Sequence, residues 1–265
     1  MAGRMVAGTA ALSAVAAGLV RPASAFAGGA GSAATAGTPD PTGLPGAGGI
    51  DRVLPVPTML TGLLPGRGLR RGSTVNVLPH RSARLGATSL LLALLAEASR
   101  AGLWCAVVGV PALGVTAAAE LGIALDRLAL VPNPGPDWPA VVAALIDGVD
   151  VVVVAAPAAV TAQVTGRLAA RARQRGCVLV PCGRWDAPDV TLQVVNGRWE
   201  GLGPGRGRLR RREMVVSARG RGALTRPREI RIWLPGGPPT PAAAAPAGGL
   251  TRRTRRAELT LVQRR

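Results

Sequence analysis

The chain has 265 residues, 48% of them apolar, and a formal net charge of +18. This length suits one large domain, or one ordinary domain with tails, and the apolar share is enough for a hydrophobic core. The three cysteines and single histidine lack the spacing of a zinc site, and the body of the chain has no run of 18 strongly apolar residues, so we expect neither a metal nor a membrane-spanning helix.

All 32 basic residues are arginine. A strongly positive protein attracts nucleic acid and acidic partners through its long-range field. A GC-rich genome also favours arginine codons over lysine codons, so the net charge overstates how much positive charge the function requires. The charge therefore favours contact with nucleic acid, direct or through a partner, without locating it.

Residues 1–50 form a low-complexity leader of Ala, Gly, Thr and Pro. Such a segment cannot bury enough apolar surface to offset its ordering entropy, so we expect it to be disordered. Arg4, the apolar residues 6–20 and Ala25-Phe26-Ala27 imitate a secretory signal with its cleavage site. We expect a cytoplasmic, nucleoid-associated protein, with export as the alternative that this leader leaves open.

A segment that starts near residue 72 has the pattern of a P-loop, in which a strand, a phosphate-binding loop and a helix follow one another. The working motif is G-x-x-x-x-G-K-[ST], whose lysine reaches the phosphates. Gly86 and Thr88 match this motif, whereas Ala87 stands in place of the lysine and Arg81 in place of the first glycine. We therefore expect no cofactor; the alternative is weak phosphate binding with charge supplied by an arginine of the loop.

Residues 51–235 are expected to form the folded domain, in which short apolar strands alternate with helices. The expected strands are 73–78, 104–110, 128–131, 149–156 and 177–182, and the expected helices are 87–101, 116–122, 137–147 and 160–175. This alternation predicts an α/β fold with a doubly wound, mostly parallel sheet. The uninterrupted apolar run 149–156 is expected to be a central strand.

Several polar or reactive residues of this region are expected to be structural. Asp137 is a candidate N-cap for the helix that follows it. Asp147 and Asp150 lie at a helix end and a strand start, and Cys105 and Cys177 are expected to be small core residues.

After residue 189 the pattern changes to that of antiparallel strands. Strands are expected at 190–195 and 198–202, joined by Asn196-Gly197 as a hairpin turn, and further strands at 213–217 and 229–234. Trp199 and Trp233 are expected to cover the core, with stacking on bases as the alternative.

Two clusters are candidates for contact with partners. The first is expected in a turn and is a candidate for nucleic-acid phosphates, a solvated hairpin tip being the alternative; it comprises Arg206, Arg208, Arg210, Arg211 and Arg212. The second lies in the Pro/Ala linker and basic tail, residues 236–265, and is a candidate for partner binding, a frayed end being the alternative; it comprises Arg252, Arg253, Arg255, Arg256, Leu259, Leu261 and Val262.

The order of these parts resembles the ATPase core of the RecA recombinase over residues 69–234. The stretches that carry the resemblance are 105–114 (CAVVGVPALG), 119–132 (AELGIALDRLALVP) and 148–156 (GVDVVVVAA). The resemblance implies that Ala87 replaces the phosphate-binding lysine, Pro111 the general-base glutamate and Ala155 the Walker B aspartate. Phosphoryl transfer depends on these groups, so the resemblance implies a pseudo-ATPase with no catalytic residues.

The whole-chain pattern is more similar to inactivated RecA-like accessory proteins of actinobacterial mutasomes, the ImuA-prime type. The matching stretches are 63–72 (LLPGRGLRRG), 98–109 (ASRAGLWCAVVG), 128–135 (LALVPNPG), 168–180 (LAARARQRGCVLV) and 198–209 (RWEGLGPGRGRL).

This second resemblance implies a non-catalytic role in DNA-damage-induced (SOS) mutagenesis, in which the protein helps recruit or organise translesion polymerases. It implies a Y-family-like polymerase adaptor and an error-prone replicative-type polymerase as partners, with DNA or a RecA filament as further candidates and no membrane. The alternatives are a DNA-dependent, recombinase-like ATPase and an SOS cell-division inhibitor.

Overall fold

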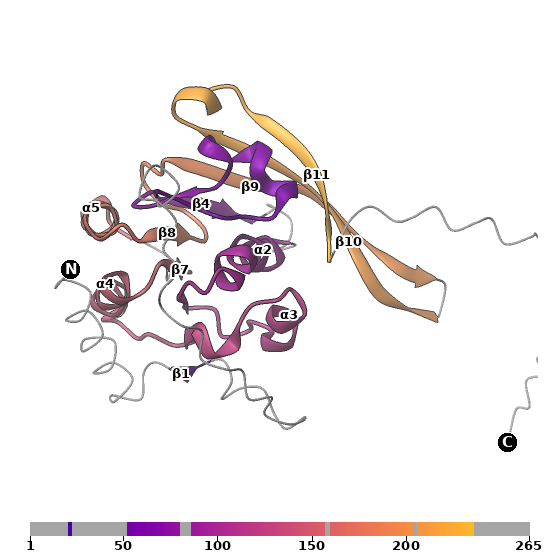
Figure 1. Ribbon diagram of the computed structural model, residues 1–265, viewed down its shortest axis with the longest axis horizontal. Helices are drawn as coiled ribbons and strands as arrows, with labels where there is room; N and C mark the ends of the chain where they lie inside the picture. Colours follow the sequence, from indigo (N-terminus) through magenta and orange to yellow (C-terminus); the bar gives the residue numbers. More distant parts are fainter. Residues whose placement is uncertain (1–20, 23–51, 80–85, 157–159, 204–205, 236–265) are drawn as a thin grey trace, which may run out of the picture.

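A computed structural model describes residues 21–22, 52–79, 86–156, 160–203 and 206–235 (Figure 1). A parallel sheet forms the centre of the fold. Its strands are β5 (Cys105–Val108), β6 (Leu128–Val131), β7 (Val151–Val154) and β8 (Val178–Pro181), with the two-residue β1 (Arg21–Pro22) antiparallel to β6. The order is β1-β6-β5-β7-β8, so β7 lies inside the sheet between β5 and β8, which agrees with its uninterrupted apolar run.

Helices cover both faces of this sheet. They are α2 (Ala87–Arg100), α3 (Val115–Glu120), α4 (Trp138–Gly148) and α5 (Ala162–Arg175). Along β7, Val151 and Val153 pack in one core cluster with α2, whereas Val152 and Val154 pack in a second cluster with α4 and α5. Successive strand residues point to opposite faces, so this division confirms the doubly wound arrangement.

A second sheet carries the antiparallel strands. It comprises β4 (Val75–Leu78), β9 (Val190–Gly203), β10 (Arg206–Gly220) and β11 (Arg228–Leu234), in the order β11-β10-β9-β4. Strand β4 is parallel to β9, and the other pairs are antiparallel. The α/β class, with a parallel sheet followed by antiparallel strands, is therefore confirmed.

Strand β4 also joins the two sheets. Parallel bridges link Thr74 to Leu179 within β8 and Val77 to Cys182 just after it. The Leu179 amide donates to the Ser73 carbonyl at 3.0 Å, and the Gly183 amide donates to the Val77 carbonyl at 3.0 Å. The strand before the P-loop-like segment is thus paired with β8 on one side and β9 on the other.

The residues that precede β4 pack onto the core. Strands β2 (Val53–Leu54) and β3 (Leu69–Arg70) form a small antiparallel pair, and 3-10 helices lie at Thr58–Leu63 and Pro65–Arg67. Leu60, Leu63 and Leu69 are fully buried. Two further 3-10 helices, at Leu125–Arg127 and Gly222–Leu224, complete the described elements.

The predicted hairpin turn at Asn196-Gly197 is wrong, because β9 continues through both residues. Asn196 pairs with Val215 and Val194 pairs with Val216, which leaves Val195 as the extra residue of a β-bulge. A type I′ turn needs a positive φ at both central residues, and neither Asn196 nor Gly197 has one. The strand therefore extends to Gly203, and Figure 1 shows the far end of β9 and β10 reaching beyond the body of the domain.

Two smaller expectations also need correction. Asp137 occupies the N-cap position of α4, but its side chain makes no capping hydrogen bond. Trp199 does not cover the core, since it is 40% exposed, whereas Trp233 is partly buried. Among the helices of the described ranges, none is long and apolar enough to cross a membrane.

Candidate functional site

The candidate site lies at the edge formed by the carboxyl ends of the parallel strands, where open α/β sheets usually bind ligands. Ala87 is the first residue of α2, which follows β4. Pro111 lies three residues after the end of β5, and Ala155 immediately follows β7. The fold therefore brings to one edge the three positions at which the RecA resemblance places catalytic groups.

None of these three side chains can ionise or coordinate a metal. Ala87 is 4% exposed and belongs to the core, while Pro111 is exposed and Ala155 partly buried. The part of the chain that the structure describes contains no group of three His, Cys, Asp or Glu residues able to hold a metal ion. These three positions thus carry neither the lysine nor the carboxylates on which phosphoryl transfer depends.

The amino end of α2 has no side-chain cap. Gly86 is its N-cap, with φ 89° and ψ −14°, and has no side chain to cap the helix. The Leu90 amide makes the first helical bond, to the Gly86 carbonyl at 2.8 Å. The amides of the first turn therefore have no acceptor within the helix. Thr88, the other surviving motif residue, is partly exposed in this turn.

The predicted arginine cluster lies in strand β10, not in a turn, because β9 ends later than predicted. Its members have different surroundings. Arg211 is partly exposed, whereas Arg212 is only 5% exposed and lies beside Trp199, with its Cζ atom 5.2 Å from the ring centroid. The side chains of Arg206, Arg208 and Arg210 lie outside the described part of the structure, as does the whole of the predicted tail cluster, Arg252 to Val262.

The pairing of Trp199 with Arg212 is a feature that sequence reasoning missed. It requires the correct hairpin register, which the assumed turn at Asn196-Gly197 obscured. The sequence Gly203-Pro204-Gly205 is the signal that could have given the right register, because Gly-Pro and Pro-Gly pairs favour turns.

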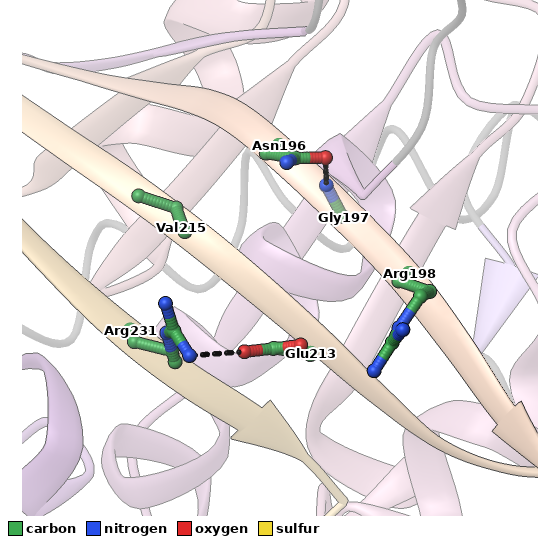
Figure 2. Close-up of a pocket in the computed structure, with 6 residues that line it drawn as sticks. All are labelled: Asn196, Gly197, Arg198, Glu213, Val215 and Arg231. Carbon is green, nitrogen blue, oxygen red and sulfur yellow. Dashed lines mark hydrogen bonds and ion pairs between the residues drawn. The ribbon is translucent and has the colours of Figure 1, made fainter.

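A shallow pocket lies on the opposite, outer face of the same strands (Figure 2). Its lining residues are Asn196, Gly197, Arg198, Glu213, Val215 and Arg231. Arg231 Nη1 lies 2.9 Å from Glu213 Oε1, and the Gly197 amide donates to Asn196 Oδ1 at 2.7 Å. The Glu213 carboxylate therefore offsets part of the positive charge that Arg198 and Arg231 bring to this pocket.

Asp150 is partly buried and the Cys105 and Cys177 thiols are buried in the core, as expected for the two cysteines. Asp150 accepts hydrogen bonds from Arg71 at 2.9 Å and from the Trp104 amide at 3.0 Å. Burial, with a smaller contribution from Asp150, raises the pKa of both the Cys105 and the Cys177 thiols to about 12. These thiols therefore stay protonated at neutral pH and are unsuited to nucleophilic chemistry.

Asp147 is held by two arginines of α5. Arg171 Nε donates to Asp147 Oδ1 at 2.8 Å, and Arg175 Nε donates to the same oxygen at 3.0 Å. The hydrogen bond from Arg171 is the main cause that lowers the pKa of Asp147, against the opposing effect of burial. These contacts tie α4 to α5, away from the carboxyl edge.

Comparison with known proteins places the chain in a family. Residues 62–187 match the family described as the MT3502 N-terminal domain. The chain is 39% identical over 145 residues to the uncharacterized protein Rv3395c of Mycobacterium tuberculosis (strain ATCC 25618 / H37Rv), a match that covers 51% of this chain and 71% of that protein. The crystal structure of the RadB recombinase is similar over 66% of this chain and 91% of its own, with 17% sequence identity and a TM-score of 0.47. By its identity and coverage, the chain belongs to the same family as Rv3395c, with the MT3502 N-terminal domain as its matched region.

Proposed function

We propose that this protein is a non-catalytic, RecA-like accessory factor in SOS mutagenesis, which helps recruit or organise translesion DNA polymerases. The observation that carries the proposal is the carboxyl edge of the sheet. Ala87, Pro111 and Ala155 occupy three separate positions along it, each after a different strand, and none carries an ionisable group. A single replacement could be compensated, but three leave little to stabilise a phosphoryl-transfer transition state.

The absence of these ionisable groups contrasts with the intact strand and helix around them. Strand β4 and helix α2 keep the strand and helix that flank a P-loop, and α2 is packed into the core by a buried face that includes Leu90, Leu94 and Leu95. This contrast supports a role in which the frame serves folding and docking. The mutasome role itself comes from the sequence resemblance to ImuA-prime-type proteins.

The proposed partners are a Y-family-like polymerase adaptor and an error-prone replicative-type polymerase, in a cytoplasmic, nucleoid-associated assembly. The strands β9 and β10 are a suitable docking element, because they extend beyond the body and carry the exposed side chains of Val195 and Trp199. We propose Arg206, Arg208, Arg210 and Arg211 of β10 for contact with DNA or a RecA filament, and the basic tail for contact with the adaptor. Arg212 is left out of this set because it is buried.

The absence of catalysis is tested by phosphate release from ATP with the purified protein and single-stranded DNA. We expect no turnover above background, with an active RecA-type recombinase as the positive control. Turnover that disappears in the Thr88→Ala variant would contradict the proposal and favour the recombinase-like ATPase.

The docking role is tested by binding of the Y-family-like adaptor. Deleting residues 251–265 should leave the thermal unfolding transition unchanged, since the described core does not include them, and should weaken adaptor binding. Replacing Arg252, Arg253, Arg255 and Arg256 by glutamine separates the charge of this cluster from the apolar residues of the tail. Unchanged binding in both variants would remove the tail from the proposal, and no adaptor binding by the full chain would contradict the role as a whole.

A further inference from the structure

We propose that the amino end of α2 is a binding site for a phosphate-class oxyanion, and that Arg212 of β10 supplies the positive charge that the missing lysine does not. The site consists of the backbone amides of the first turn of α2, the Thr88 hydroxyl and the Arg212 guanidinium. Arg212 belongs to an antiparallel strand that carries no part of the P-loop pattern.

The end of the helix provides the first half of the site. Helix α2 has 14 residues, and its positive dipole end and the first-turn amides, which have no acceptor within the helix, favour an anion at its amino terminus. Gly86 brings the backbone close to β10: a Cβ atom on this glycine would be 2.7 Å from Met214 Sδ and 3.4 Å from Arg212 Nη2. The guanidinium is therefore positioned directly beside the start of the helix.

The second, independent observation is that the Arg212 side chain is buried and that two of its nitrogen atoms, Nε and Nη2, have no hydrogen-bond partner in the structure as described. No described carboxylate forms an ion pair with it; the neighbouring Glu213 pairs with Arg231 instead. Burial accordingly lowers the pKa of the Arg212 guanidinium, although arginine stays protonated at neutral pH.

A buried cation without an anion is unfavourable, because the lost hydration is not replaced. The Trp199 ring replaces part of it, since the Arg212 Cζ atom lies 5.2 Å from the ring centroid. The unpaired Nε and Nη2 atoms are neighbours on the guanidinium fork, the arrangement that binds two oxygens of one phosphate group. An oxyanion between this fork and the amides of α2 would satisfy both sets of donors.

The inference goes beyond the proposed function, since it assigns a ligand class to an edge that the mutasome role does not require. It concerns binding without turnover. Loss of phosphate binding would leave the polymerase-recruitment proposal intact, and loss of adaptor binding would leave the anion site intact.

The test is the thermal unfolding midpoint of the full chain during titration with sodium phosphate, against sodium chloride at matched ionic strength. We expect a saturable rise in the wild-type midpoint below about 10 mM phosphate, because a ligand of the folded state stabilises it by mass action. The Arg212→Met variant keeps an apolar stem of similar length without the charge, and its apparent affinity should fall by about tenfold or more. Its midpoint without phosphate should be equal to or above the wild-type value.

Arg231→Met is the matched control, because Arg231 lies on the neighbouring strand β11 and already pairs with Glu213; it should keep the full phosphate response. If Arg212→Met does not fold, Arg212→Lys keeps the charge and loses the planar fork, and its response should be reduced. The inference is overturned if the wild type shows no saturable response beyond that to chloride, or if the Arg212 variants respond like the wild type.

ADP and adenosine identify the source of the anion. Tighter binding of ADP than of phosphate, with no binding of adenosine, supports a nucleotide phosphate at this site. Equal affinity for ADP and phosphate supports a free oxyanion. Binding of adenosine comparable to that of ADP would contradict an anion-directed site.

Discussion

Gly109 lies directly against the backbone of Ala155. A Cβ atom on Gly109 would be 2.3 Å from the Ala155 carbonyl oxygen, and the glycine has a positive φ of 77°. The Ala155 amide also donates to the Val108 carbonyl at 2.9 Å. The carboxyl ends of β5 and β7 are thus held together by a contact that only glycine permits, at the edge where Pro111 and Ala155 lie.

The Gly109→Ala variant should lose about 2–4 kcal/mol of unfolding free energy, because a left-handed alanine is strained and its methyl group would overlap the carbonyl. Urea unfolding measures the loss. Gly135→Ala is the matched control, since Gly135 has a similar φ of 72° and no described atom lies within 4 Å of the position that an added methyl group would take, so it should lose only about 1–2 kcal/mol. Equal losses in the two variants would show that the contact with Ala155 contributes nothing.

Asp150 connects β7 to two distant segments. Its carboxylate accepts from Arg71 and from the Trp104 amide, and its side chain is 14% exposed. Replacing Asp150 by alanine should cost about 1–3 kcal/mol, because a backbone donor and a half-buried guanidinium lose their acceptor. Arg71→Ala should cost less, since Asp150 still accepts the hydrogen bond from the Trp104 amide. A double-mutant cycle measures the coupling between the two side chains, and a coupling free energy of zero would show that the ion pair contributes nothing to stability.

The pairing of Asp147 with Arg171 should make part of the stability depend on pH. Because the folded-state pKa of Asp147 lies below its ordinary value of 3.8, its contribution is fully present above that value and is lost as the pH falls through the folded-state pKa. At pH 7, Asp147→Asn should therefore be less stable by about 0.5–1 kcal/mol. At about pH 2 the difference from the wild type should shrink. A deficit of equal size at both pH values would mean that the carboxylate charge is not its cause.

The raised pKa of Cys105 and Cys177, about 12 in each case, predicts that neither thiol reacts in the native protein. In a Cys182→Ala background these are the remaining two cysteines. A disulfide reagent such as DTNB should label neither at neutral pH and both after unfolding in denaturant, because the thiolate is the reactive form. Rapid labelling of the folded variant would contradict the burial of these two thiols.

The parallel sheet could be predicted from the sequence because its strands are covered on both faces. A strand such as Val151–Val154 can then be apolar at every position, and such a run between helix patterns has few other interpretations. The helices α2 and α5 were equally visible, since each ends in a recognisable glycine or charge pattern. These elements depend on local sequence and burial alone.

The antiparallel part depended on register, which local sequence specifies poorly. Asn196-Gly197 has strong turn chemistry, but pairing with β10 keeps it in a strand and places the irregularity at Val195. The same register gives Arg212 a buried position, whereas the neighbouring Arg211 stays partly exposed. Nothing in the run Arg210-Arg211-Arg212 tells that the third faces Trp199 and the start of α2, because that depends on pairing across the hairpin.

The position of β4 has a consequence for how the domain unfolds. Since this strand is hydrogen-bonded to β8 on one side and to β9 on the other, the helical layer and the projecting arm share a backbone ladder and are not independent folding units. Loss of β4 would expose the edges of both sheets at once. The domain should therefore melt in a single cooperative step, and the fold requires the strand that leads into α2 whatever the amino end of that helix binds.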